Sequence, residues 1–369
     1  MIKNKRREDW LCGKCLIIMY DEIFTLILAG GIAVLFSWAF KTLPKEDWQI
    51  LACVPQRKGI DGVWEGINFT YYGFFNASAY LFAVVMLLIM MGSISIAFVG
   101  TLSVVILVLS ICMPAARLIA RWVEKKQHTF SVGAASFTGI LIAPWIILLV
   151  NITLGKWLQF RMPILETLGA IFIAYAFGEG IGRLACISFG CCYGKPLSAC
   201  NPLIKRIFQH WNFTFQGKTK KIAYATHLDG QAVVPVQALT AIIYTGTGLL
   251  NVYLFLKGKA PAALLITLVM TQGWRFISEF LRADYRGRGR ISAYQIMALF
   301  AIIYTIVMVI FFAGSEHIVP NLFTGINSLW NPGLVIFLGI LWVIAFVYAG
   351  KSSVTYSAIS IQIIENNRL

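Results

Sequence analysis

The chain has 369 residues, of which 59% are hydrophobic and only 13% are charged, and its mean hydropathy is +0.75. Soluble globular chains carry about 25% charged residues, so this composition excludes that class and indicates a polytopic helical membrane protein. The net charge of +15 does not indicate nucleic-acid binding, because the basic residues flank apolar runs. They are better explained as topology determinants and as an attraction for anionic lipid headgroups.

Nine apolar segments have about the 20 residues that a helix needs to cross the hydrocarbon core. The first follows a basic N-terminus and lacks a small-residue cleavage site after it, so it is interpreted as a retained helix rather than a signal peptide. The run from Ala77 to Ala120 is too long for one crossing and is divided near Gly100. The predicted spans are Ile23–Phe40, Ala77–Gly100, Thr101–Ala120, Phe130–Val150, Pro163–Gly182, Val236–Leu256, Ala262–Leu281, Gln295–Ala313 and Pro332–Ala349.

Two segments between the spans are more polar. Residues 41–76 are mixed in character, and their aromatic residues Trp48, Trp64, Tyr71 and Tyr72 are typical of an interfacial belt. Residues 195–234 form the longest polar segment, and we expect a small extramembrane head there.

The orientation in the membrane is predicted from the basic N-terminus, which favours a cytoplasmic start. With nine spans, the C-terminus then lies outside. The basic residues of the short loops 121–127 and 282–290 favour the reverse orientation, unless they serve binding instead of topology.

Three arginines, Arg183, Arg275 and Arg282, are predicted at membrane depth. A charged residue there is costly unless it has a partner or a ligand, so we expect Arg183 and Arg275 to face a common cavity that takes a lipid phosphate. Glu279 lies one helical turn after Arg275. We expect it to pair with Arg275 or Arg282 and to orient that arginine.

The eight cysteines are scattered along the chain. Cys12 and Cys15 have CxxC spacing, but no second pair completes a zinc site, and we expect neither a metal nor a cofactor. Cys112 lies in an apolar run and is interpreted as a packing residue. The cysteines between Cys186 and Cys200 cluster near a predicted membrane interface, where disulfides require an oxidising compartment.

Three motifs occur in a fixed order. They comprise Gly182, Arg183, Gly190 and Gly194; then Pro235 and Gln237; then Arg275, Phe276, Glu279, Phe280 and Arg282. With these residues the chain resembles the bacterial prolipoprotein diacylglyceryl transferase family over residues 77–313. The resemblance implies an all-α transmembrane bundle of seven family-like spans with one extra span at each end. It also suggests three parts: residues 1–76 with the N-terminal helix and aromatic loop, the membrane domain 77–313, and an extra C-terminal helix and tail, 314–369.

The chain departs from the family pattern at several positions. Cys186 and Cys191 stand where the family has asparagine and glutamate, and Lys195 replaces an arginine. Phe137-Thr138-Gly139 stands for a His-Gly-Gly turn, so a histidine is lost. Thr271 replaces a tyrosine, and Val234 replaces the histidine before Pro235.

The resemblance implies transfer of a diacylglyceryl group from phosphatidylglycerol to the cysteine thiol of a lipoprotein precursor, in the bacterial cytoplasmic (inner) membrane. Its partners would be that lipid, the signal peptide of the prolipoprotein and the surrounding membrane lipids, without nucleic acid. An alternative is a repurposed or inactive lipid-binding protein of the same family.

Residue roles follow from the same motifs. The catalytic candidates are Arg183, Arg275 and Glu279, since guanidinium groups match phosphate oxygens and stay charged. The substrate-binding candidates are Gly182, Gly190, Gly194, Lys195, Gln237 and Arg282. Cys191 or Cys192 could act as a nucleophile and His227 as a base, although packing or disulfide roles for the cysteines and a solvated loop position for the histidine are the simpler interpretations.

Overall fold

The computed structural model describes residues 2–46, 49–60, 62–124, 131–283, 291–314 and 318–359, with side chains described between residues 19 and 351 of these ranges. The predictions made for the Cys12 and Cys15 side chains, for Trp48 and for the basic loop residues 125–127 and 284–290 lie outside this part of the chain.

Nine of the described helices are long and apolar enough to span a membrane, which confirms the predicted polytopic bundle. Their bounds are α1 Ile2–Thr42 with its apolar part Met19–Thr42, α2 Tyr71–Ser93, α3 Phe98–Glu124, α4 Val132–Val150 with a π-helical turn Asn151–Gly155, α5 Ile164–Phe189, α8 Val236–Leu256, α9 Ala260–Leu281, α10 Ala293–Phe311 and α12 Pro332–Gly350.

Some predicted boundaries were wrong. The long apolar run breaks after Ser93 and not near Gly100, at a turn in which Ser95 has a left-handed φ of 59°. Helix α5 continues to Phe189, well past its predicted end at Gly182. The helix continues because the charge of Arg183 is paired within the helix, with Glu179 one turn earlier.

Helix α5 lies at the centre of the bundle and packs against α2, α8 and α9. Glycines on α5 permit these close contacts. A Cβ atom on Gly180 would lie 2.7 Å from Thr245 Cγ2 of α8, and one on Gly178 would lie 3.0 Å from Ala83 Cβ of α2. These two glycines therefore fix how near α2 and α8 approach α5 on either side of Glu179.

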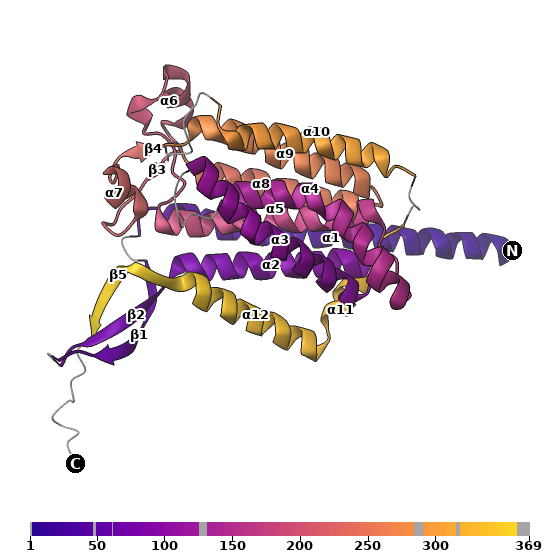
Figure 1. The fold of residues 1–369 in the computed structure, drawn as a ribbon. Helices are drawn as coiled ribbons and strands as arrows, with labels where there is room; N and C mark the ends of the chain where they lie inside the picture. The colour runs from indigo at the N-terminus through magenta and orange to yellow at the C-terminus, as the bar shows by residue number, and fades with distance from the viewer. Residues whose placement is uncertain are drawn as a thin grey trace, which may run out of the picture.

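The predicted head forms a small unit beyond the end of α5, visible as α6 and α7 beside one end of the bundle in Figure 1. It contains α6 (Pro202–Phe208), β3 (Phe213–Thr214), α7 (Lys221–Thr226) and β4 (Ala232–Val233), and β3 pairs with β4. Buried Lys220 donates hydrogen bonds from Nζ to the carbonyl oxygens of Leu43, at 3.0 Å, and Ser188, at 2.8 Å. This lysine therefore ties the head to the ends of α1 and α5.

A three-stranded antiparallel sheet lies at the same end as the head (Figure 1). Its order is β1 (Ile50–Lys58), β2 (Trp64–Thr70) and β5 (Lys351–Ile359). The segment 41–76 was expected to be a loop, but it forms a hairpin and the first turns of α2. The interfacial position of its aromatic residues stays a prediction. The short helix α11 (Leu322–Leu329) packs against α2, and the N-terminus lies at the opposite end of the bundle from the head and sheet.

Candidate functional site

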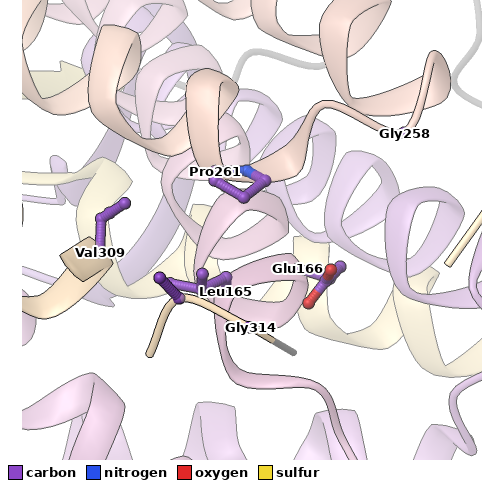
Figure 2. Close-up of a pocket in the computed structure, with 7 residues that line it drawn as sticks. Leu165, Glu166, Gly258, Pro261, Val309 and Gly314 are labelled. Atoms are coloured by element: carbon purple, nitrogen blue, oxygen red, sulfur yellow. The ribbon is translucent and has the colours of Figure 1, made fainter. Parts of the chain in front are cut away.

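A cavity of about 190 Å³ lies at the end of the bundle away from the head. Figure 2 shows it between the start of α5, the α8–α9 turn and the end of α10. It is lined by Leu165, Glu166, Gly258, Pro261, Val309, Ala313 and Gly314. Glu166 is in the first turn of α5, and Arg183 lies more than four turns further along, roughly 25 Å at 1.5 Å per residue. This cavity is therefore separate from the arginine residues singled out by the sequence.

The two arginines Arg183 and Arg275 converge on one buried carboxylate, that of Glu179. Arg275 Nη2 lies 2.9 Å from Glu179 Oε2 and 3.0 Å from Oε1, and Arg183 Nη2 contacts Oε1 of the same group. The Glu179 side chain is 4% exposed, and those of Arg183 and Arg275 are 13% and 12% exposed. The two arginines lie close together, but they meet at a carboxylate, and the common cavity for a lipid phosphate stays a prediction.

The local geometry follows from helical spacing. Tyr175, Glu179 and Arg183 are successive i, i+4 residues of α5 and so share one face. The Tyr175 hydroxyl accepts a hydrogen bond of 3.0 Å from Arg275 Nη2. On the other side, a Cβ atom on Gly133 of α4 would lie 2.7 Å from Arg275 Nη1. The Arg275 guanidinium is thus held between α5 and a glycine of α4.

The cluster retains an excess of positive charge, since two guanidinium groups share one carboxylate. The Nε atoms of both arginines are buried and have no hydrogen-bond partner in the described part of the chain. A buried N–H donor without a partner is costly. An anion with several acceptor oxygens, such as a phosphate, would satisfy these donors.

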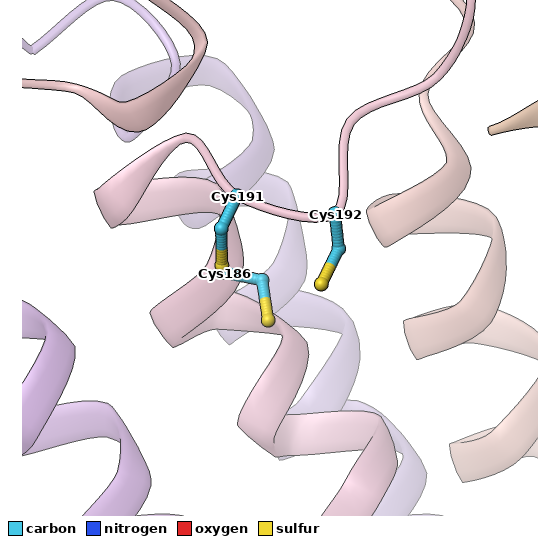
Figure 3. A group of neighbouring side chains, drawn as sticks. All are labelled: Cys186, Cys191 and Cys192. Carbon is cyan, nitrogen blue, oxygen red and sulfur yellow. The ribbon is translucent and has the colours of Figure 1, made fainter. Parts of the chain in front are cut away.

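A cysteine turn follows directly after α5. The helix ends at Gly190, whose φ is +66°, and Cys192 also has a left-handed φ, +55°. Figure 3 shows Cys186 on the last turns of the helix facing Cys191 and Cys192 on the turn. The three Sγ atoms lie within 4.8 Å of one another, and Arg183 Nη1 is 3.9 Å from Cys186 Sγ. The cysteine turn and the arginine cluster are therefore one continuous site.

Residues named by the sequence motifs hold this turn. Gln237, in the first turn of α8, donates from Nε2 to the Cys191 carbonyl at 2.8 Å. The backbone of Gly194 forms an antiparallel bridge with Arg282. A Cβ atom on Gly194 would lie only 2.3 Å from the Val234 carbonyl oxygen, so this position requires glycine. These contacts bring the end of α9, with Arg282, against the cysteine turn.

The thiols of the turn differ in acidity. Hydrogen bonds from Cys186 and Cys191, followed by the charges of Arg282 and Arg183, lower the pKa of the Cys192 thiol well below its usual range. Hydrogen bonding to Cys186 and Cys192, together with burial, raises the pKa of the Cys191 thiol. Arg282 and Arg183 are thus close enough to Cys192 to stabilise negative charge on its sulfur.

The predicted pairing of Glu279 with Arg275 or Arg282 is wrong, because neither pair is among the ion pairs of the described residues. Arg275 turns toward α5, where Glu179 offers two oxygens and Tyr175 a third. Glu279 is half-buried and instead accepts a hydrogen bond of 3.5 Å from Ser292 Oγ, ahead of α10.

Two other candidates lie in or beside the head. His227 is exposed and ends α7 in a left-handed conformation with φ +53°, as expected for a solvated loop histidine. The Lys195 side chain is exposed, while its backbone N–H donates to the Leu281 carbonyl at 2.9 Å. The described contacts of these two side chains do not include Glu179.

Glu179 and Tyr175 were not predicted as site residues. A signal was present, since a glutamate four residues before an arginine is the favourable order for a helical ion pair. The motif around Arg275 points to Glu279 of α9 as the partner, whereas the structure shows Glu179 of α5.

A nine-span helical bundle with a buried arginine site beneath a small head defines a multi-pass membrane protein. The family model described as prolipoprotein diacylglyceryl transferase matches residues 63–311. This is more than half of the chain, and it includes the arginine cluster, the cysteine turn and the head. The chain belongs to this family of transferases of lipoprotein biosynthesis. No curated protein and no solved structure matched the chain.

Proposed function

We propose that this protein transfers a diacylglyceryl group from phosphatidylglycerol to the cysteine thiol of a lipoprotein precursor, in the cytoplasmic membrane of a bacterium. The observation that carries the proposal is the convergence of Arg183 and Arg275 on Glu179. These arginines come from two separate motifs of the family, and both keep a buried N–H donor without a partner in the described residues. Substrate recognition would use these donors.

In the proposed reaction, the thiolate of the precursor attacks the glyceryl carbon that carries the phosphate ester. A carbon–sulfur bond forms, the carbon–oxygen bond breaks, and glycerol phosphate leaves with the electron pair. The thiol proton passes to solvent before the attack. Guanidinium groups suit this step, because they bind phosphate oxygens in a bidentate manner and remain charged. By analogy with an oxyanion donor, one such contact contributes about 3–4 kcal/mol in the transition state.

Glu179 has a positioning role in this proposal. It occupies Nη2 of both arginines and so fixes the planes of the guanidinium groups, leaving the Nε edges for the lipid. The remaining positive charge of the pair, with Arg282 near the cysteine turn, favours an anionic headgroup. Glu279 stays a catalytic candidate that would act from the end of α9.

The alternative is a lipid-binding relative without transfer activity. The observation that favours it is the cysteine turn, where Cys186 and Cys191 replace hydrogen-bonding residues of the family. Thiols are weak donors and acceptors, and cannot align a lipid as an amide or carboxylate does. In this alternative the arginine site still binds the lipid, but diacylglyceryl transfer does not occur.

Complementation of a bacterium depleted of its own transferase tests the proposal, together with phosphatidylglycerol binding to the purified chain. We expect the wild-type chain to restore growth, and Arg183→Ala or Arg275→Ala to abolish both growth and lipid binding. Arg206→Ala, in exposed α6, is the matched control and should restore growth fully. Absence of rescue by the wild-type chain, with lipid still bound through Arg183, would establish the non-catalytic alternative.

A further inference from the structure

The cysteine turn gathers three thiol groups at one point, although their spacing in the sequence matches no common metal motif. Cys186, Cys191 and Cys192 are half-buried and are not joined by a disulfide, and their Sγ atoms lie within 4.8 Å of one another. Cys186 comes from α5, and the other two come from the turn that Gln237 and Gly194 hold in place. Figure 3 shows Cys186 and Cys191 at the end of the helix and Cys192 on the following turn, with the sulfur of Cys192 directed back toward the helix.

We propose that these three cysteines form a site for one soft monovalent cation, for which Cu(I) is the biological example. Sulfur ligands at about 2.3 Å from a metal lie about 4 Å apart in a three-coordinate site. The observed separations need to shrink by less than about 1 Å to reach this geometry. Thiolate ligands select soft metals such as Cu(I) over Mg²⁺ or Ca²⁺.

A metal accounts for the cluster better than a disulfide does. A disulfide joins two sulfurs at about 2.05 Å, so it would leave the third thiol unused. Cys191 and Cys192 are adjacent in the chain, and Cys192 is held in a left-handed conformation that turns its sulfur toward Cys186. A non-glycine residue in this region costs about 1–3 kcal/mol and persists only where its surroundings enforce it.

The neighbouring charges favour the thiolate form of these ligands. Arg183 Nη1 is 3.9 Å from Cys186 Sγ, and Arg282 is bridged to the same turn through Gly194. Both arginines stabilise thiolates, which is the form that binds a metal, and binding releases the thiol protons to solvent. Structural Zn²⁺ sites are almost always four-coordinate, whereas the cluster brings together three Sγ atoms in the described residues. The number of sulfur ligands therefore favours Cu(I) over Zn²⁺.

Copper binding can be measured on the full chain in detergent, under reducing conditions, by titrating Cu(I) against the chelator bathocuproine disulfonate. The Cys12→Ser/Cys15→Ser variant serves as background, because those two residues have CxxC spacing. We expect one equivalent of Cu(I) to be retained in this background. Cys186→Ser or Cys192→Ser should each weaken binding at least about 10-fold, since even outer-shell changes cost 10- to 100-fold in metal affinity.

Cys200→Ser is the matched control. Its thiol donates to the Pro196 carbonyl at 3.4 Å and lies outside the three-thiol cluster, so this change should leave Cu(I) affinity unaltered. Loss of binding on removing Cys12 and Cys15 would overturn the proposal, as would tighter retention of Zn²⁺ than of Cu(I). A disulfide from Cys186 to Cys191 or Cys192, found by mass spectrometry in protein taken directly from membranes, would overturn it as well.

If a serine variant of the cluster misfolds, X-ray absorption spectroscopy of the copper-loaded Cys12→Ser/Cys15→Ser variant still tests the proposed copper site. Three sulfur neighbours at about 2.3 Å support the site. A shell with fewer sulfurs, or one made of nitrogen and oxygen, contradicts it.

Discussion

At the residue scale, Glu179 couples the two arginines, because each donates to its carboxylate from inside the bundle. Removal of one partner of a buried ion pair costs about 3–5 kcal/mol, since the remaining charge is left without compensation. The same removal at an exposed pair costs at most about 1 kcal/mol. Stability measurements on the two kinds of pair can therefore be compared within this chain.

We predict that Glu179→Gln lowers the midpoint of thermal unfolding in detergent far more than Glu65→Gln does. Glu65 pairs with Arg57 at 3.3 Å, but the two side chains are 52% and 76% exposed. Equal shifts for the two variants would contradict the assigned role of Glu179 as the carboxylate that holds both arginines.

A second prediction concerns Arg275→Lys, which keeps the charge and removes the planar fork. In Arg275 the single nitrogen Nη2 contacts both oxygens of Glu179 and the Tyr175 hydroxyl, which leaves Nε for a phosphate. A lysine has one nitrogen, so it cannot hold these partners and also present a second N–H group to the lipid. Diacylglyceryl transfer should fall at least about 10-fold, a loss of about 1.4 kcal/mol in transition-state stabilisation. Initial rates with labelled phosphatidylglycerol measure it, and Arg206→Lys should retain the wild-type rate. Full activity of Arg275→Lys would show that only its charge matters.

At the element scale, hydropathy predicted the existence of every span but not all of their ends. A charged residue usually marks the end of an apolar helix, and Arg183 was interpreted in that way. The pair with Glu179 removes this signal and lets α5 continue to Phe189. Strand β5 could not be predicted from its own residues, because it is completed by pairing with β2, far away in the sequence.

A third prediction follows from the close crossing of α5 and α8. Gly180→Ala places a Cβ atom 2.7 Å from Thr245 Cγ2 and 3.1 Å from the Thr245 backbone nitrogen. Overpacking of this kind costs about 1–3 kcal/mol. Gly246→Ala, on the same helix pair but with nothing within 4 Å of its Cβ position, should leave stability unchanged or raise it by up to about 1 kcal/mol. The midpoints of thermal unfolding of the two variants test this prediction. A destabilised Gly246→Ala together with an unaffected Gly180→Ala would contradict the close packing of α5 against α8.

At the scale of the whole molecule, the nine described spans place the head and the N-terminus at opposite ends of the bundle (Figure 1). The bundle was predictable from composition and hydropathy, because both depend on the membrane as solvent. The site could not be predicted in this way, because contact between Glu179, Arg275 and the cysteine turn depends on how α5, α8 and α9 pack.

A fourth prediction concerns orientation, with the N-terminus in the cytoplasm and the head outside. In intact cells, a membrane-impermeant maleimide should label Ser198→Cys, exposed in the head, more strongly than the unsubstituted chain. Lys156→Cys, exposed directly after the π-helical turn that ends α4, should become labelled only after the cells are opened. The opposite pattern would reverse the topology and place the arginine site near the cytoplasmic leaflet.

The central claim is that the arginine pair supports diacylglyceryl transfer, and the most direct measurement is product formation by the purified chain. Labelled phosphatidylglycerol and a precursor peptide with a single cysteine are incubated with the protein, and the peptide is analysed by mass spectrometry. We predict a diacylglyceryl thioether on the peptide cysteine, formed together with an equal amount of glycerol phosphate, and its loss in Arg183→Ala and Arg275→Ala but not in Arg206→Ala. Unmodified peptide with the wild-type chain, or thioether formation that persists in both arginine variants, would contradict the account.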